Sequence, residues 1–183
     1  MIKYNVHDFF QRMDNDKVKD ISLKMSLPAA LILFNVDGGI NISMSIRSAA
    51  LFGFSDVYIV GKRKRDKRGD VGACNYINVH QVESIDNDYF TKNNLIPIII
   101  EQNGQPLEEM DFHSYFPNSK KKVAFIVGSE QEGIPSYIKK KDIPIITISQ
   151  YGVMRSFNVA MASSIVMYEY TRQWRKMILK DIL

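Results

Sequence analysis

The chain has 183 residues, of which 45% are apolar and 11% aromatic, and these values exclude a chain that is disordered throughout. Lys and Arg outnumber Asp and Glu by 24 to 20, a mild basic balance that permits a polyanionic partner without requiring one. The single cysteine, Cys74, excludes an internal disulfide framework and fits a reducing compartment. No spacing of Cys and His would build a zinc site, so we expect no metal.

The N-terminal region predicts a helical extension rather than a separate domain. Apolar residues recur at mostly helical spacing among charged residues over 2–26, and Pro28 then ends the pattern. We therefore assign 1–27 to a helical extension and 28–183 to one domain. No stretch approaches the roughly 18 apolar residues that span a membrane, and the first residues do not form a signal peptide. We expect a soluble protein of the cytoplasm.

The rest of the chain alternates between predicted strands and helices. Short, continuous apolar runs predict buried strands at 30–36, 56–60, 95–101, 122–128 and 143–149. Helices are predicted at about 41–53, 88–94 and 136–141, and from about residue 157 onward. This alternation predicts an α/β fold with a mainly parallel sheet, helices on both faces, and ligands at the carboxyl ends of the strands.

One strand end carries two glycines and a carboxylate, in the segment 125–135. Gly128 would let a backbone approach a ligand closely, and Gly133 would permit a turn that a side chain obstructs. Glu130 lies between them and could hold a hydroxyl, an amine or a neighbouring arginine. Taken alone, this segment could equally be a glycine-flanked surface loop.

Two further strand ends, in the segments 35–53 and 148–160, lead into predicted helices. Ser156 and Asn158 lie at the start of the last helix, where either could be an ordinary N-cap. Asn41 could likewise cap its own helix, and Arg47 could be a solvated or paired surface residue. The sequence leaves these alternatives open.

Taken in order, the three segments resemble the signature motifs of the SpoU-type (SPOUT class, TrmH-like) RNA 2′-O-ribose methyltransferases, over roughly residues 28–172. The resemblance implies a C-terminal trefoil knot, which general topology rules do not predict. It implies S-adenosylmethionine as cofactor, structured RNA as substrate, with tRNA preferred over rRNA, and a homodimer. The catalytic residues that it implies are Arg47, Asn41, Glu130, Ser156 and Asn158. The implied cofactor contacts, mostly from the backbone, are Glu101, Gly128, Ile148, Ser156 and Phe157.

The chemistry that the resemblance implies restricts what Arg47 can do. Methyl transfer to a ribose 2′-oxygen requires an alcohol to lose a proton, and an arginine with a pKa above about 12 is a poor base. We expect Arg47 to bind the adjacent phosphate and to stabilise developing alkoxide charge, with Glu130 orienting it or helping to move the proton. Whether Arg47 itself accepts the proton stays open. None of these steps requires a metal.

Two positions depart from the family pattern. Ser43 stands where the family usually has glycine, and Phe157 stands where it usually has leucine. Phe157 is bulkier at a place where the adenine of the cofactor is expected to pack. These departures leave an alternative, a catalytically silent RNA-binding protein that keeps the methyltransferase fold.

A basic segment follows the second predicted strand. Its positive residues, interrupted only by Asp66, are Lys62, Arg63, Lys64, Arg65, Lys67 and Arg68. Such a run is either a solvated surface or a patch that follows RNA phosphates, and its position after a core strand favours RNA binding. His7, His80 and His113 have no nucleophile in register, so we interpret them as structural.

Overall fold

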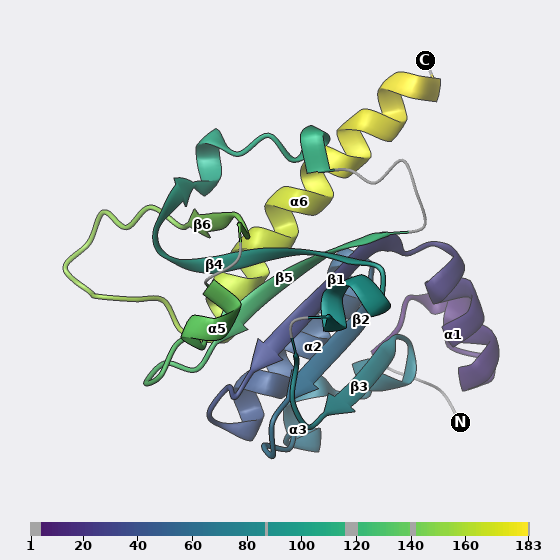
Figure 1. Ribbon diagram of the computed structural model, residues 1–183. Helices are drawn as coiled ribbons and strands as arrows, with labels where there is room; N and C mark the ends of the chain where they lie inside the picture. Colours follow the sequence, from purple (N-terminus) through teal and green to yellow (C-terminus); the bar gives the residue numbers. More distant parts are fainter. Residues whose placement is uncertain (1–4, 87, 116–120, 140–141, 183) are drawn as a thin grey trace.

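The computed structural model describes residues 5–86, 88–115, 121–139 and 142–182, which form one six-stranded sheet with helices on both faces (Figure 1). The strand order is β3-β2-β1-β5-β4-β6, and every adjacent pair is parallel. The strands are β1 (Leu27–Phe34), β2 (Phe54–Val60), β3 (Asn78–Val82), β4 (Leu95–Pro106), β5 (Lys122–Gly128) and β6 (Ile145–Thr147). The α-helices are α1 (Asn15–Lys24), α2 (Gly39–Phe52), α3 (Lys67–Asp70), α4 (Tyr89–Lys92), α5 (Ser136–Lys139) and α6 (Val159–Ile182). The predicted α/β class and parallel sheet are confirmed.

The three central strands are buried on both faces, which explains their continuous apolar sequences. On one face, Leu31 and Phe125 pack against side chains of α2 and α6, including Ile46 and Tyr170. On the other face, the apolar side chains pack against the short helices α4 and α5. The long helix α6 crosses behind the sheet next to α2, so these two helices form one layer (Figure 1).

Several boundaries differ from the sequence predictions. The N-terminal helix is shorter than predicted, because Asp14 caps it by accepting a hydrogen bond from the Lys17 amide at 2.8 Å. Pro28 does not end that helix but lies within β1. Strand β6 is shorter than predicted, and β4 continues past Glu101, with a register shift between Ile100 and Gln105. The last two residues of the predicted helix 136–141 lie outside the described residues.

Strand β3 was not predicted at all. It pairs with β2 at the edge of the sheet, and its sequence contains Asn78, His80 and Gln81, so it offers no apolar run. The trefoil knot stays a prediction. Among the described helices, none is long and apolar enough to cross a membrane.

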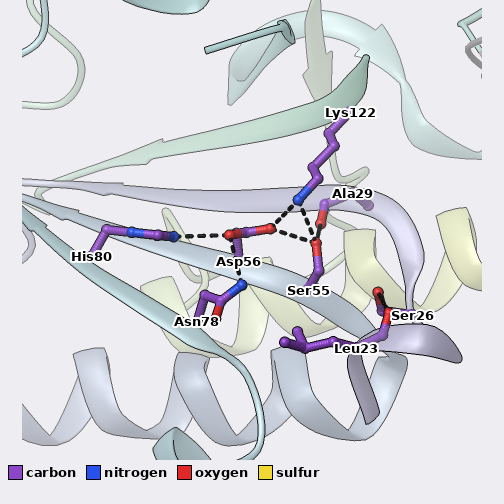
Figure 2. Close-up of polar contacts among 8 residues, drawn as sticks. All are labelled: Leu23, Ser26, Ala29, Ser55, Asp56, Asn78, His80 and Lys122. Atoms are coloured by element: carbon purple, nitrogen blue, oxygen red, sulfur yellow. Dashed lines mark hydrogen bonds and ion pairs between the residues drawn. The ribbon is translucent and has the colours of Figure 1, made fainter. Parts of the chain in front are cut away.

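A polar network around the buried carboxylate of Asp56 joins β2, β3 and β5 at the amino end of the sheet (Figure 2). The Asp56 carboxylate accepts hydrogen bonds from Ser55 Oγ at 2.5 Å, from Asn78 Nδ2 at 3.3 Å and from Lys122 Nζ, and it lies 2.8 Å from His80 Nε2. Burial raises the pKa of Asp56, but the hydrogen bonds from Lys122, Ser55 and His80 outweigh this effect and lower the pKa below its ordinary value. The contact with Asp56 gives His80 a structural role in pairing β3 with β2.

Candidate functional site

A pocket of about 1010 Å³ lies at the carboxyl ends of β4, β5 and β6. Its walls come from the end of β4, the turn after β5 and the loop between β6 and α6, which is the yellow-green segment beside β6 in Figure 1. All five predicted cofactor contacts line it: Glu101, Gly128, Ile148, Ser156 and Phe157. Glu130 and Arg155 also line the pocket, whereas Asn41, Arg47 and Asn158 do not. Sequence segments far apart in the chain therefore meet at one cavity.

The turn after β5 depends on its two glycines. The Gly133 amide donates to the Ser129 carbonyl at 2.9 Å, and a Cβ on Gly128 would lie 2.3 Å from the Gly133 carbonyl carbon. Gly133 itself has a φ of +64°. The Ser129 hydroxyl accepts a hydrogen bond from the Glu132 amide at 2.9 Å, which tightens the turn. The turn presents the exposed side chain of Glu130 at the pocket.

The loop between β6 and α6 is fixed at several points. Glu108 accepts hydrogen bonds from Ser149 and from the Tyr151 hydroxyl, and the bond from Ser149 lowers the pKa of Glu108. On the pocket side, Gln102 Nε2 donates to the Arg155 carbonyl at 2.8 Å. These contacts hold the backbone of the loop in place beside the pocket.

Asn158 connects this loop to the first motif. Its Oδ1 accepts a hydrogen bond from the Ala160 amide at 2.9 Å, so Asn158, rather than Ser156, supplies the N-cap bond of α6. Its Nδ2 donates to Asn41 Oδ1 at 3.0 Å. Asn41 in turn donates to the Asp37 carbonyl at 3.1 Å, while the N-cap residue of α2 is Gly38. One side chain thus serves both as a cap and as the link between two motifs.

Arg47 is exposed on α2 and does not line the pocket of its own chain. With Ile40, Met44 and Leu51 it forms a line of exposed residues spaced four, three and four apart, the spacing of one helical face. The exposed fractions of the three apolar side chains are 46%, 47% and 74%. We call this line the α2 stripe. Solvated hydrophobic side chains in such an array are typical of an interaction surface.

Further apolar side chains are exposed outside α2. Met161 and Tyr168 are exposed on α6, and Tyr151, Val153 and Met154 are exposed on the loop before it. Helices α2 and α6 pack side by side, and the Ser164 hydroxyl donates to the Ser48 hydroxyl at 2.8 Å. Helix α2, which carries the stripe, is therefore next to the helix that begins at the pocket.

The arginines of the basic segment are paired with carboxylates. Arg63 lies 2.8 Å from Asp37, and Arg68 lies 2.6 Å from Asp66. The Arg68 guanidinium lowers the pKa of the Asp66 carboxyl to about 2. Arg65 pairs with the buried carboxylate of Asp70. By contrast, Lys62, Lys64 and Lys67 are exposed and form no ion pair with another described residue.

The segment is also fixed to the first motif. The Ser43 hydroxyl donates to the Asp66 carbonyl at 2.5 Å, and the Asp66 amide donates to the Gly39 carbonyl at 2.9 Å. Ser43, one of the two departures from the family pattern, thus anchors the basic segment to α2. In the described part of the chain, no group of His, Cys, Asp and Glu side chains could hold a metal ion.

Some site residues carried no signal in the sequence. Lys139 lies 2.6 Å from the Glu101 carboxylate in the wall of the pocket, but in the sequence it is one member of a lysine run. Gln102 and Glu108 contact the loop before α6 from segments 53 and 41 residues away. One sequence signal was available for Gln102: it follows Glu101 at the point where the apolar strand ends in polar residues.

The fold and the pocket define a parallel α/β protein whose binding site lies at the carboxyl ends of the strands. Residues 28–168 match the SpoU rRNA Methylase family, and the chain belongs to this family. It is 25% identical over 143 residues to the tRNA (guanosine(18)-2′-O)-methyltransferase of Borreliella burgdorferi. The match covers 74% of this chain and 62% of that protein. This chain therefore spans less than two thirds of that relative's length.

Solved structures agree with the fold. The A. aeolicus TrmH/SpoU tRNA modifying enzyme has a TM-score of 0.73 and 20% identity, and the match covers 89% of this chain and 83% of that one. The AdoMet-bound rRNA methyltransferase from Sinorhizobium meliloti has a TM-score of 0.65 and 22% identity, and the match covers 79% of this chain and 56% of that one.

Proposed function

We propose that this protein transfers a methyl group from S-adenosylmethionine to a ribose 2′-hydroxyl of structured RNA, with tRNA as the preferred substrate. One observation carries the proposal: the second and third motifs line one pocket, and the hydrogen bond from Asn158 to Asn41 joins them to the first. Family membership supports methyl transfer to RNA. The names of the Borreliella relative and of the A. aeolicus enzyme favour tRNA, while the Sinorhizobium enzyme acts on rRNA. An RNA substrate of this kind fits a cytoplasmic enzyme.

The pocket residues fit S-adenosylmethionine. The volume of the pocket, about 1010 Å³, reaches the upper end of the range for ordinary small-molecule sites, about 300–1,000 Å³. Val127, Ile134 and Phe157 offer apolar surface for an adenine, and the Glu101 carboxylate offers acceptors for hydroxyl groups. A cofactor without phosphates needs no phosphate-binding glycine loop, and the sequence contains none. When bound, the cofactor supplies an electrophilic methyl group.

Around the acceptor ribose, we assign roles by charge and position. Arg47 binds the phosphate next to the target ribose with its planar guanidinium and stabilises negative charge that develops on the 2′-oxygen. Glu130 is exposed at the pocket, where it can orient Arg47 or receive the proton that the hydroxyl loses. Asn41 and Asn158 hold α2 against the start of α6, and Ser156 lines the pocket beside them.

A homodimer would bring Arg47 to a pocket. The α2 stripe surrounds Arg47 with exposed apolar side chains, and Arg47 does not line the pocket of its own chain. We assign this surface to a second copy of the chain, because further apolar side chains are exposed on α6, which packs against α2, and on the loop beside the pocket. Each Arg47 then serves the pocket of the partner subunit, which makes the site dependent on assembly.

We assign binding of the RNA backbone to the basic segment. Lys62, Lys64 and Lys67 are exposed and unpaired among the described residues, so their charge can attract phosphates. Arg63, Arg65 and Arg68 were also predicted to bind RNA, but each already pairs with a carboxylate. We therefore assign the lysines the larger share of the affinity for RNA.

The proposal is tested with purified protein in two steps. Calorimetry with S-adenosylhomocysteine measures cofactor binding, and incubation of unmodified tRNA with methyl-labelled S-adenosylmethionine measures transfer. We expect binding, and label in nuclease-resistant dinucleotides, because a 2′-O-methyl group blocks cleavage of the neighbouring phosphodiester. Absence of cofactor binding would identify the silent RNA-binding alternative, and label on a base would exclude ribose as the acceptor.

A further inference from the structure

Glu101 and Lys139 form an ion pair within the pocket wall. Glu101 follows the buried core of β4, and Lys139 ends α5 on the neighbouring segment of chain. The Lys139 ammonium lies 2.6 Å from the Glu101 carboxylate, and the two side chains are 34% and 30% exposed. A pair with this much solvent contact contributes little to stability, so stability alone gives little reason for it. Its position points instead to a role in binding.

The Glu101 carboxylate is restrained from more than one side. A Cβ built on Gly133 would lie 3.2 Å from Glu101 Oε1, so the carboxylate rests against the turn of the second motif. The next residue, Gln102, donates to the Arg155 carbonyl in the third motif. Lys139 then fixes the side chain from α5. The carboxylate is therefore held at the junction of the walls that form the pocket.

A carboxylate held in this way suits a vicinal diol. Its two oxygens offer about four acceptor sites, and Lys139 uses only part of them. The adjacent 2′- and 3′-hydroxyls of an adenosine ribose are two neighbouring donors, and acidic residues hold ribose hydroxyls in the same manner in dinucleotide-binding sites. Without Lys139, the carboxylate would also attract the positively charged parts of the methyl donor, and it would lose its fixed direction.

We propose that Lys139 is a positioning residue for the cofactor: it holds the Glu101 carboxylate so that this group accepts hydrogen bonds from the ribose hydroxyls of S-adenosylmethionine. The inference rests on the proposed function, because it requires this cofactor in the pocket. It adds a residue outside the three motifs and assigns Glu101 a specific partner on the ligand. Lys139 acts through Glu101 and does not take part in methyl transfer.

The test is calorimetry with two probes, S-adenosylhomocysteine and its 2′,3′-dideoxy analogue. Lys139→Gln and Glu101→Gln should each weaken binding of S-adenosylhomocysteine about tenfold, because each disturbs a hydrogen bond to a charged group. The double variant should be no weaker than the single variants, and Lys139→Arg should restore most of the affinity. The dideoxy analogue should bind the wild type and Lys139→Gln equally, since it has no diol to position.

A matched control separates this role from the general loss of an ion pair. Lys24→Gln breaks the exposed pair with Asp20, at 2.7 Å on α1, and should leave both affinities unchanged. Wild-type affinity of Lys139→Gln for S-adenosylhomocysteine would overturn the inference, and so would an equal loss for both probes. If the wild type binds neither probe, the proposed function itself fails. If the wild type binds S-adenosylhomocysteine and Lys139→Gln binds it equally well, only the inference about Lys139 fails. In turnover assays, Lys139→Gln should raise KM for the cofactor and leave kcat nearly constant.

Discussion

Removing the charge of Asp56, on β2 next to the edge strand β3, should destabilise the folded protein. Asp56 is 4% exposed and faces four hydrogen-bonding side chains, Ser55, Asn78, His80 and Lys122 (Figure 2). In Asp56→Asn, the amide oxygen can still accept, but the amide nitrogen faces groups that themselves donate. The substitution leaves the Lys122 ammonium without its counter-charge.

The magnitude follows from the burial of the two partners. Breaking a fully buried ion pair costs about 3–5 kcal/mol, mainly because the remaining charge has lost its partner away from water. The Lys122 side chain is 36% exposed and can regain some hydration, so we expect a loss of about 2–3 kcal/mol. Urea unfolding followed by circular dichroism measures this loss. Asp20→Asn, at an exposed pair on α1, is the matched control and should cost less than about 1 kcal/mol.

The same network predicts a dependence on pH. Because the pKa of Asp56 is lower in the folded protein than its ordinary value of 3.8, its contribution to stability is complete above that value. The contribution is lost as the pH falls through the folded-state pKa. The wild type should therefore lose stability toward acid more steeply than Asp56→Asn does. A cost below about 0.5 kcal/mol for Asp56→Asn, with equal acid slopes, would refute the reasoning.

The remaining predictions concern the proposed reaction. Arg47→Ala should abolish methyl transfer to tRNA while calorimetry finds the affinity for S-adenosylhomocysteine nearly unchanged, because the contacts assigned to Arg47 are with the RNA phosphate and the 2′-oxygen and not with the cofactor. Changing Lys62, Lys64 and Lys67 together to Gln should weaken tRNA binding and reduce the slope of log affinity against log salt by up to about three, as measured by fluorescence anisotropy. Leu51→Glu should place a charge in the α2 stripe and shift the protein from dimer to monomer in sedimentation experiments, with loss of transfer activity.

Each of these expectations has a contrary outcome. Normal turnover in Arg47→Ala would exclude a catalytic role for Arg47. An unchanged salt dependence of tRNA affinity would show that the three lysines do not bind RNA. A Leu51→Glu protein that sediments as the wild type does would exclude the α2 stripe from the dimer interface. Comparable melting temperatures of variant and wild type establish that each effect is not one of unfolding.

Much of the fold could be predicted because the central strands are buried on both faces. Strand β1 and strand β5 read as unbroken apolar runs, and a run of that length ending at small residues has few other interpretations. Strand β3 could not be found in this way, because it is half-buried and its polar residues bond to its neighbour. His80 and Asn78, for example, face the Asp56 carboxylate on β2. Such contacts exist only after the strands have paired.

The candidate site was predictable only in part, for a similar reason. Glycines such as Gly128 and Gly133 mark a turn by their residue type, so the pocket walls could be located. The Lys139 ion pair depends on where α5 lies relative to β4, and no local pattern encodes that distance. Nor could the sequence tell that Arg47 does not line the pocket of its own chain, since the face on which a helical residue lies is defined only when the helix packs.

The central claim is that the three strand-end motifs form one site for methyl transfer to a ribose. Mass spectrometry of ribonucleosides from tRNA of cells with and without this protein tests it most directly. We expect one 2′-O-methylated nucleoside to disappear when the protein is absent, and to return with the wild type but not with Arg47→Ala. An unchanged set of 2′-O-methylated nucleosides in both tRNA and rRNA would contradict it.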